Sequence, residues 1–433
     1  MTGHQDHREA PTAPAGMLSP YPAAPPSVPT PCPAGPPDPA SRAPVQPPPP
    51  PTPASYQPDP APPDARPTGT ADRPPVPQRL WCADEEGLLA LSVWTERVAG
   101  RGEDAEPFVA HHRAGLQGML AVFDGSGGAG AAPVWQASDG ASRTGAWVGA
   151  RVARLATDVW FHDVTVEGEE ATPKTLREYL RFFLGYAPQR RSKISGTMRR
   201  QLPTTLAGVH YRVAGNGYEP QVELQPLWAG DSRAYVLRPR TGLRVLTRDH
   251  TRESDALELL RTDPPMTNLV CADREFEIAG RRLAYPLPCV LVAATDGFFG
   301  YVHTPADFET LLLRTLRDAG TVEEWADLVR REVQGYTADD ASLALVALGY
   351  HGFPDLRAQF ASRHEELTVR YVRTRPRGLD RPSLAADGTG GRVTGTEDAA
   401  GLPARVRLWQ DDTWRAYRAG YETDLPPAPE EHA

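Results

Sequence analysis

Four short acidic segments, each beside an apolar run typical of a β-strand, constrain this chain more than any other feature. They are Glu103-Asp104, Asp124-Gly125, Asp296-Gly297 and Asp339-Asp340. A carboxylate at the end of a buried strand is held rigidly and still reaches solvent. Mg²⁺ and Mn²⁺ prefer such oxygen ligands, together with backbone carbonyls and waters. One such segment alone is typical of an ordinary turn, but the four together favour a shared metal site.

The order of the expected elements favours an α+β fold. Apolar patterns predict strands at 88–93, 118–123, 206–213, 222–229, 234–237, 290–294 and 342–348, and helices at 140–160, 176–184, 308–316 and 322–333. The Asn216-Gly217 pair is a hairpin signal between two of the strands. Strands and helices do not alternate strictly, which argues against a doubly wound sheet. We expect residues 78–353 to form one domain with a large core.

The two ends of the chain differ from this domain in composition. Of the 47 prolines, 27 lie in the first 80 residues, so residues 1–77 are expected to be a disordered tail with polyproline II character. This tail is either a linker or a docking segment. Residues 354–433 form an extension with an expected helix at 356–372, a linker near 374–403, and Trp414, Tyr417 and Tyr421 at helical spacing. That aromatic stripe either docks onto the core or binds a partner.

Charge and cysteine content exclude several classes of protein. The net charge of −9 and the lack of a basic stripe argue against nucleic-acid binding. The four cysteines show neither metal-binding nor disulfide spacing. The sequence has no signal-peptide pattern and no apolar run of the roughly 20 residues that span a bilayer. We therefore expect a cytoplasmic protein with no membrane partner.

Several motifs, taken in their order along residues 84–349, resemble the metal-dependent protein phosphatase 2C (PPM) family of Ser/Thr phosphatases. The blocks that carry the resemblance are RGEDA, VFDGSGG, LPTTLAGV, LWAGDSRAYVL, LTRDHT, ATDGFFG and DDASLALVAL. The resemblance implies a central β-sandwich flanked by helices, with two Mn²⁺ or Mg²⁺ ions at one end. It also implies hydrolysis of phosphoserine or phosphothreonine in proteins, such as the substrates of a Ser/Thr kinase, by a hydroxide bound to both metals.

The same resemblance implies roles for individual residues. Asp124 would bridge both metals, and Gly125 would offer its carbonyl to one of them. Asp296 and Asp339 would complete one coordination shell, so that Asp124, Asp296 and Asp339 form the catalytic core. Glu103 would act through bound water, with Asp104 beside it. Asp231 matches a position that can help to hold a third ion, or it fixes a turn together with Arg233; both interpretations stay open.

The sequence departs from the family pattern at positions that concern phosphate more than metal. Ala99 stands where the family has its phosphate-binding arginine, so Arg97 or Arg101 becomes the candidate, since a guanidinium matches phosphate oxygens; either could equally be an ordinary surface arginine. Gly300 stands where the family often has an aspartate of the third metal site. Ser126 replaces a residue that can act as an acid or a hydrogen-bonding group.

Two hypotheses follow from these observations. The first is a Mg²⁺/Mn²⁺-dependent protein-serine/threonine phosphatase that acts in signalling. The alternative is a non-catalytic, phosphatase-like regulatory or binding module. Retention of Asp124, Asp296 and Asp339 favours the enzyme, whereas Ala99 and Gly300 favour the module. The adjacent His111 and His112 point to opposite faces of a strand, so they are not expected to share a metal ion, and His250 is expected to pack a loop.

Overall fold

The computed structural model describes residues 80–138, 140–188, 200–214, 220–262, 264–377, 379 and 402–428. All of them belong to one compact unit, residues 72–433. The expected proline-rich tail and the expected Asn216-Gly217 turn lie outside the described residues.

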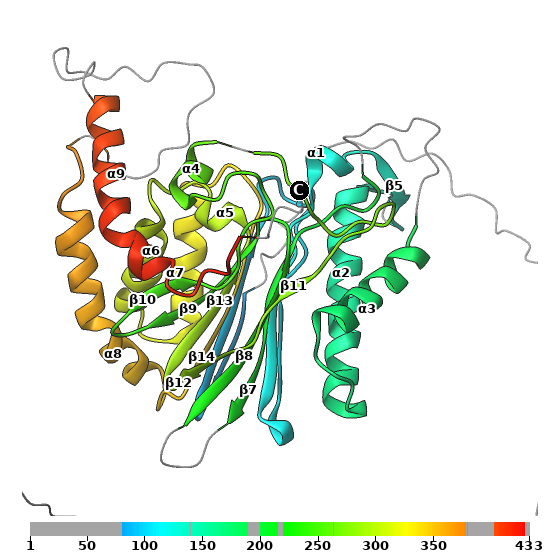
Figure 1. Ribbon diagram of the computed structural model, residues 1–433, viewed down its shortest axis with the longest axis horizontal. Helices are drawn as coiled ribbons and strands as arrows, with labels where there is room; N and C mark the ends of the chain where they lie inside the picture. Colours follow the sequence, from blue (N-terminus) through cyan, green and yellow to red (C-terminus); the bar gives the residue numbers. More distant parts are fainter. Residues whose placement is uncertain are drawn as a thin grey trace, which may run out of the picture. The chain divides into compact units, whose positions relative to one another are not determined.

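Two antiparallel sheets lie face to face at the centre of this unit (Figure 1). The first sheet has the order β1-β2-β14-β13-β9-β10, and the second has the order β11-β8-β7-β4-β3, with β12 also paired to β8. The strands of the first sheet are β1 (Trp81–Glu85), β2 (Leu88–Thr95), β9 (Arg233–Arg238), β10 (Gly242–Val245), β13 (Cys289–Ala294) and β14 (Ala341–Leu348). Those of the second are β3 (Phe108–His112), β4 (Gln117–Val122), β7 (Leu206–Ala214), β8 (Gln221–Ala229), β11 (Ala279–Gly280) and β12 (Leu283–Pro286).

The central strands are apolar along their whole length because both of their faces are covered. Every residue of β4, β13 and β14 is buried. One set of side chains, including Leu120, Val236 and Val346, fills the space between the two sheets. The alternate side chains point outward to the helices. This arrangement explains why the sequence shows continuous apolar runs and not a strict alternation.

Helices cover the outer face of each sheet (Figure 1). On the second sheet lie α2 (Gly145–His162) and α3 (Pro173–Tyr186), joined by the π-helical turn η3 (Asp163–Glu167). On the first sheet lie α6 (Pro305–Asp318), α7 (Val322–Gln334), α8 (Phe353–Leu367) with its π-helical end η4 (Thr368–Val372), and α9 (Leu402–Tyr421). The predicted α+β sandwich flanked by helices is confirmed by this topology.

The remaining elements are short. They are η2 (Arg113–Gly115), α1 (Gly127–Gly130), α4 (Ala256–Arg261), α5 (Asp296–Phe299) and the separate hairpin of β5 (Pro133–Gln136) and β6 (Ser142–Thr144). Thr144 ends this hairpin and caps α2, because its side chain accepts a hydrogen bond from the amide of Trp147. The hairpin and α2 therefore have a fixed relation to each other.

The C-terminal aromatic stripe docks onto the core, as one of the two interpretations of the sequence expected. Trp414, Tyr417 and Tyr421 of α9 are buried in the same cluster as the side chains of α6 and α7. Within the described residues, no helix combines the length and the apolar character that crossing a bilayer requires.

Candidate metal centre

The acidic residues singled out in the sequence gather at one end of the sandwich. Asp124 follows β4, Asp231 lies between β8 and β9, and Asp296 follows β13. Antiparallel pairing brings the start of β14, which Asp339 precedes, beside the end of β13, since Ala294 pairs with Leu343. Glu103 and Asp104 lie in the segment between β2 and β3. Both sheets thus contribute carboxylates to the same end.

Asp124 is held by a backbone junction just beyond β4. Its carbonyl oxygen accepts a hydrogen bond from the Thr204 hydroxyl at 2.7 Å and one from the Thr205 amide at 2.8 Å. Gly125 forms an isolated β-bridge with Thr204. The Thr204-Thr205 pair, which follows Pro203, therefore fixes the aspartate.

Asp104 is the most deeply buried of these carboxylates, with 2% of its surface exposed. It accepts hydrogen bonds from the hydroxyls of Thr295 at 3.1 Å and Ser342 at 2.9 Å. The Asp104 and Asp124 carboxyls are near enough to influence each other's pKa. Asp104 therefore links the segment after β2 to the facing ends of β13 and β14.

Glu103 sits against the glycine-rich turn that follows Asp124. A Cβ atom on Gly125 would lie 2.6 Å from the Glu103 carbonyl oxygen, and one on Gly127 would lie 2.1 Å from its Oε2. The approach of Gly125 to backbone atoms requires glycine, whereas a side chain at residue 127 would displace the Glu103 carboxylate. The other carboxylate oxygen, Oε1, accepts a hydrogen bond from Thr144 at 2.5 Å. Glycines in the DGSGG block thus let Glu103 approach Asp124.

Two residues that the sequence did not single out as site residues hold the Glu103 segment in place. The side chain of Asp340 accepts hydrogen bonds from the backbone amides of Arg97 at 2.8 Å and Glu103 at 2.6 Å. Arg151 of α2 donates to the carbonyl oxygens of Glu103 at 3.1 Å and Gly102 at 3.4 Å. Asp340 was visible in the DDAS block, but no sequence signal showed that Arg151 would reach this segment.

The carboxylates are close enough to shift one another's pKa. Burial is the largest cause that raises the pKa of Asp124, and the negative charges of Asp104, Asp231 and Asp339 add to it. Burial also dominates for Asp296, followed by Asp124, Asp231 and Asp339. The pKa of Asp104 is raised by burial and then by Asp340. For Glu103, burial raises the pKa, and Asp340 and Asp339 contribute.

The structure therefore brings Asp231 into the same electrostatic cluster as the predicted ligands. Gly300 lies close by, where its amide donates to the Asp296 carbonyl oxygen at 2.5 Å. A Cβ atom at Gly300 would lie 2.8 Å from that oxygen. A side chain at this position would press on the Asp296 backbone, so the local packing favours the glycine.

This set of donors fits a hard divalent cation in its chemistry. All of the side chains are carboxylates, and their mutual repulsion and desolvation favour neutralisation by a proton or a cation. In the described part of the chain, however, no three His, Cys, Asp or Glu side chains already converge in a geometry that could hold a metal ion. Ion binding would require these side chains to turn toward a common point.

The remaining candidates make other contacts or are exposed. His111 hydrogen-bonds the Tyr211 hydroxyl at 3.1 Å, and His112 accepts from the Gly115 amide. His250 accepts from the Gly230 amide at 3.1 Å and stacks on Trp228, which confirms its packing role. The side chains of Arg97 and Arg101 are exposed on the segment that leads to Glu103.

In the comparisons with known proteins, only the search of solved structures gave matches. No family model and no curated protein matches this sequence. A bacterial serine phosphatase is similar with 17% identity and a TM-score of 0.42, over 60% of this chain and 97% of that one. The serine/threonine phosphatase Stp1 from Staphylococcus aureus has 16% identity and a TM-score of 0.42, over 60% and 94%. The catalytic domain of the serine threonine protein phosphatase PstP, in complex with two manganese ions, has 17% identity and a TM-score of 0.36, over 60% and 98%.

Proposed function

We propose that this chain is a metal-dependent protein-serine/threonine phosphatase of the 2C type, which hydrolyses phosphomonoesters with Mn²⁺ or Mg²⁺. One observation carries the proposal: Asp124 and Asp296, which follow β4 and β13, and Asp104, from the segment between β2 and β3, meet at one end of the sandwich, where burial and neighbouring carboxylates raise the pKa of each. Such an arrangement costs stability unless a cation neutralises it. Functional sites are where this cost is tolerated.

Asp124, Asp296 and Asp339 are the proposed metal ligands, with the carbonyl of Gly125, and Asp231 is the candidate for a third ion. Glu103 would act through water, with Asp104, which accepts hydrogen bonds from Thr295 and Ser342, beside it. When bound, two divalent cations supply Lewis acidity, which lowers the pKa of water and stabilises charge on the phosphoryl oxygens. The chain itself supplies a rigid frame, since Thr204, Thr205 and Asp340 hold the backbone of these residues.

The competing function is a non-catalytic module that retains the fold. It is favoured by Ala99, which offers no group to bind phosphate, and by Gly300, which offers no carboxylate.

One experiment separates the two functions. Hydrolysis of a small aryl phosphate is measured with the full chain and Mn²⁺, beside an Asp124→Ala control; the full chain is required because α8 and α9 bury core residues. We expect metal-dependent turnover that the control lacks. Metal binding by calorimetry without turnover above the control would favour the module. A separate check is the Mn²⁺-induced rise in melting temperature, which Asp296→Asn should abolish.

A further inference from the structure

The turn between β8 and β9, residues 230–232, brings Asp231 to the acidic centre. The charge of Asp231 raises the pKa of both Asp124 and Asp296, so its carboxylate lies within electrostatic reach of two proposed metal ligands. The turn leads directly into β9, which pairs with β13, and Asp296 follows β13. The place of the Asp231 carboxylate therefore depends on what fixes the backbone of this turn.

Thr205, just before β7, holds one side of the turn. Gly230 has a φ of +101°, and a Cβ atom there would lie 2.7 Å from the Thr205 side chain, so the position requires glycine. The hydroxyls of Thr205 and Ser232 share a hydrogen bond of 2.6 Å. The Thr205 amide also donates to the Asp124 carbonyl oxygen at 2.8 Å. One threonine thus relates the turn to Asp124.

His250, in the loop after β10, holds the other side of the turn. Its amide donates to the Gly230 carbonyl oxygen at 2.9 Å, and its ring Nδ1 accepts from the Gly230 amide at 3.1 Å. Both polar groups of the Gly230 backbone are therefore bonded to one residue. Because a backbone amide can only donate, Nδ1 is the acceptor and the ring is the neutral Nε2–H tautomer. Burial lowers the pKa of His250, which favours this neutral form.

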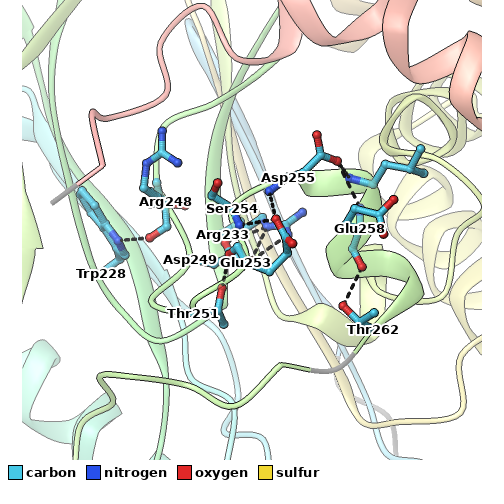
Figure 2. A network of polar contacts seen from close by, with 12 residues as sticks. Trp228, Arg233, Arg248, Asp249, Thr251, Glu253, Ser254, Asp255, Glu258 and Thr262 are labelled. Atoms are coloured by element: carbon cyan, nitrogen blue, oxygen red, sulfur yellow. Dashed lines mark hydrogen bonds and ion pairs between the residues drawn. The ribbon is translucent and has the colours of Figure 1, made fainter. Parts of the chain in front are cut away.

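The His250 ring is itself held in place. It stacks on Trp228 of β8, with ring centroids 6.1 Å apart and planes at 15°. The His250 carbonyl oxygen accepts a hydrogen bond from the Thr267 amide at 2.7 Å. The preceding residue, Asp249, binds Arg233 through hydrogen bonds of 2.9 and 2.7 Å, and Figure 2 shows this pair. The imidazole is thus a fixed acceptor against which the turn is set.

The residues around Asp231 are each bonded to another part of the chain: Gly230 to His250, Ser232 to Thr205, and Arg233 to Asp249. The sequence offered Arg233 as the residue with which Asp231 fixes the turn, whereas the structure pairs the Arg233 guanidinium with Asp249. Contacts of the neighbouring residues therefore fix the backbone on both sides of Asp231 and set where its carboxylate lies.

We propose that His250 positions Asp231 for a divalent cation by fixing the Gly230 backbone. This inference rests on the proposed function and deepens it, because it names a residue outside the ligand set that determines the affinity for the third ion. His250 touches neither ion nor substrate, so it is a positioning residue. A carboxylate held by its surroundings loses less conformational entropy when it binds an ion, so the ion binds more tightly.

Two substitutions separate the hydrogen bond of His250 from its packing. His250→Phe keeps a ring for Trp228 and loses the acceptor. His250→Asn loses the ring and keeps an acceptor, since Oδ1 of asparagine is as many bonds from the backbone as Nδ1 of histidine. His112→Phe is the matched control, because His112 Nδ1 also accepts from a glycine amide, that of Gly115, at the end of β4 far from the acidic centre. Asp231→Asn gives the effect of losing the carboxylate.

All measurements use the full chain. In the metal-free protein, His250→Phe should speed hydrogen exchange at the Gly230 amide by about 5- to 30-fold, because one hydrogen bond is lost. In calorimetric titration with Mn²⁺, Asp231→Asn should lose a weak binding event of the parent, and His250→Phe should weaken that event by a similar factor. The Mn²⁺ concentration for half-maximal hydrolysis of an aryl phosphate should rise with it, at unchanged KM in saturating Mn²⁺. His250→Asn should restore most of each value, and His112→Phe should match the parent.

Equal losses in His250→Phe and His250→Asn would assign His250 to packing alone and overturn the inference. Mn²⁺ binding by His250→Phe that equals the parent would also overturn it, as would a parent that binds no more Mn²⁺ than Asp231→Asn does. In the Asp231→Asn background, His250→Phe should cause no further loss of Mn²⁺ affinity, and an additive loss would mean that it acts on other ligands. If the parent shows no turnover, the proposed function fails, and Mn²⁺ binding with hydrogen exchange decides the inference separately.

Discussion

Charged side chains are buried in two regions of this molecule, and the two regions neutralise them differently. Beneath α9, Arg233 forms an ion pair with Asp249 in which the side chains are 4% and 7% exposed, and Figure 2 shows the two facing each other. Nearby, Glu309 pairs with Arg363 and accepts a hydrogen bond from the Tyr417 hydroxyl at 2.6 Å. Each carboxylate here has a cation of its own.

At the end of the sandwich, by contrast, carboxylates face carboxylates. The pKa values of Asp104, Asp124 and Asp296 are raised because these groups are buried and repel one another. The chain supplies hydroxyl groups and backbone amides to this cluster, and among the described residues Asp104 forms no ion pair with a cation. The first region is therefore neutralised within the chain, whereas we propose that a divalent cation from solution neutralises the second.

The largest expected effect is the loss of a cation from the self-neutralised region. Arg233→Met leaves Asp249 buried without its ion-pair partner, which should lower the free energy of unfolding by about 3–5 kcal/mol. It also removes a guanidinium that lies 4.3 Å from the ring centroid of Phe299. Urea denaturation of the full chain measures the change. Arg317→Met, which breaks an exposed pair with Asp318, should cost no more than about 1 kcal/mol; similar losses for both variants would contradict the comparison.

At the carboxylate cluster, in contrast, removal of a charge is expected to raise the free energy of unfolding. In metal-free protein near pH 8, Asp124→Asn removes a charge that burial and three neighbours disfavour, so it should raise the free energy of unfolding by roughly 1–3 kcal/mol. The same variant should lose the stabilisation by Mn²⁺ that the parent shows. Thermal melting with and without Mn²⁺ checks both results. A destabilised metal-free variant would mean that the charge of Asp124 is satisfied within the chain.

The pH dependence of stability should separate the two regions further. A raised carboxyl pKa means that the folded state binds protons more tightly than the unfolded state. In the metal-free protein these carboxyls should therefore contribute their full stability below their usual pKa, and this contribution should be lost as the pH rises through the raised values, by at most about 1.4 kcal/mol per pH unit for each carboxyl. Saturating Mn²⁺ should flatten this slope above pH 6. A slope unchanged by Mn²⁺ would show that these carboxyls do not bind the ion.

The sequence predicted the long central strands and the covering helices because their apolar patterns are set by burial. The fully buried β13 and β14 and the amphipathic α6 and α7 are clear examples. The edge strands β1, β10 and β12 and the hairpin β5–β6 were not predicted, since they are short and carry polar residues. Their pairing depends on neighbours distant in the sequence, which a local pattern does not report.

The site residues also divide into those that a local sequence pattern reports and those whose contacts depend on distant parts of the chain. Asp124, Asp296 and Asp339 could be located because each lies beside a predicted strand, and Asp231 was located only through the family resemblance. The contacts of Thr144, Arg143 and Arg151 with residues 100–103 could not, because they depend on how the start of α2 approaches the segment between β2 and β3. Sequence patterns thus indicated the proposed metal ligands and missed the residues that surround them.

The smallest expected effects concern the two tyrosine hydroxyls by which α9 reaches the buried ion pairs. Tyr417→Phe removes a donor to Glu309, which keeps Arg363 at 2.8 Å, so the loss should be about 1–2 kcal/mol. The Tyr421 hydroxyl lies 3.5 Å from Arg233 Nη1, at the limit of a hydrogen bond, so Tyr421→Phe should cost about 0.5 kcal/mol or less. Urea denaturation ranks the two variants. Neither should alter the Mn²⁺-induced shift, because their partners lie in the region that needs no ion; a smaller shift in Tyr421→Phe would show that α9 acts on Asp296 through Arg233 and Phe299.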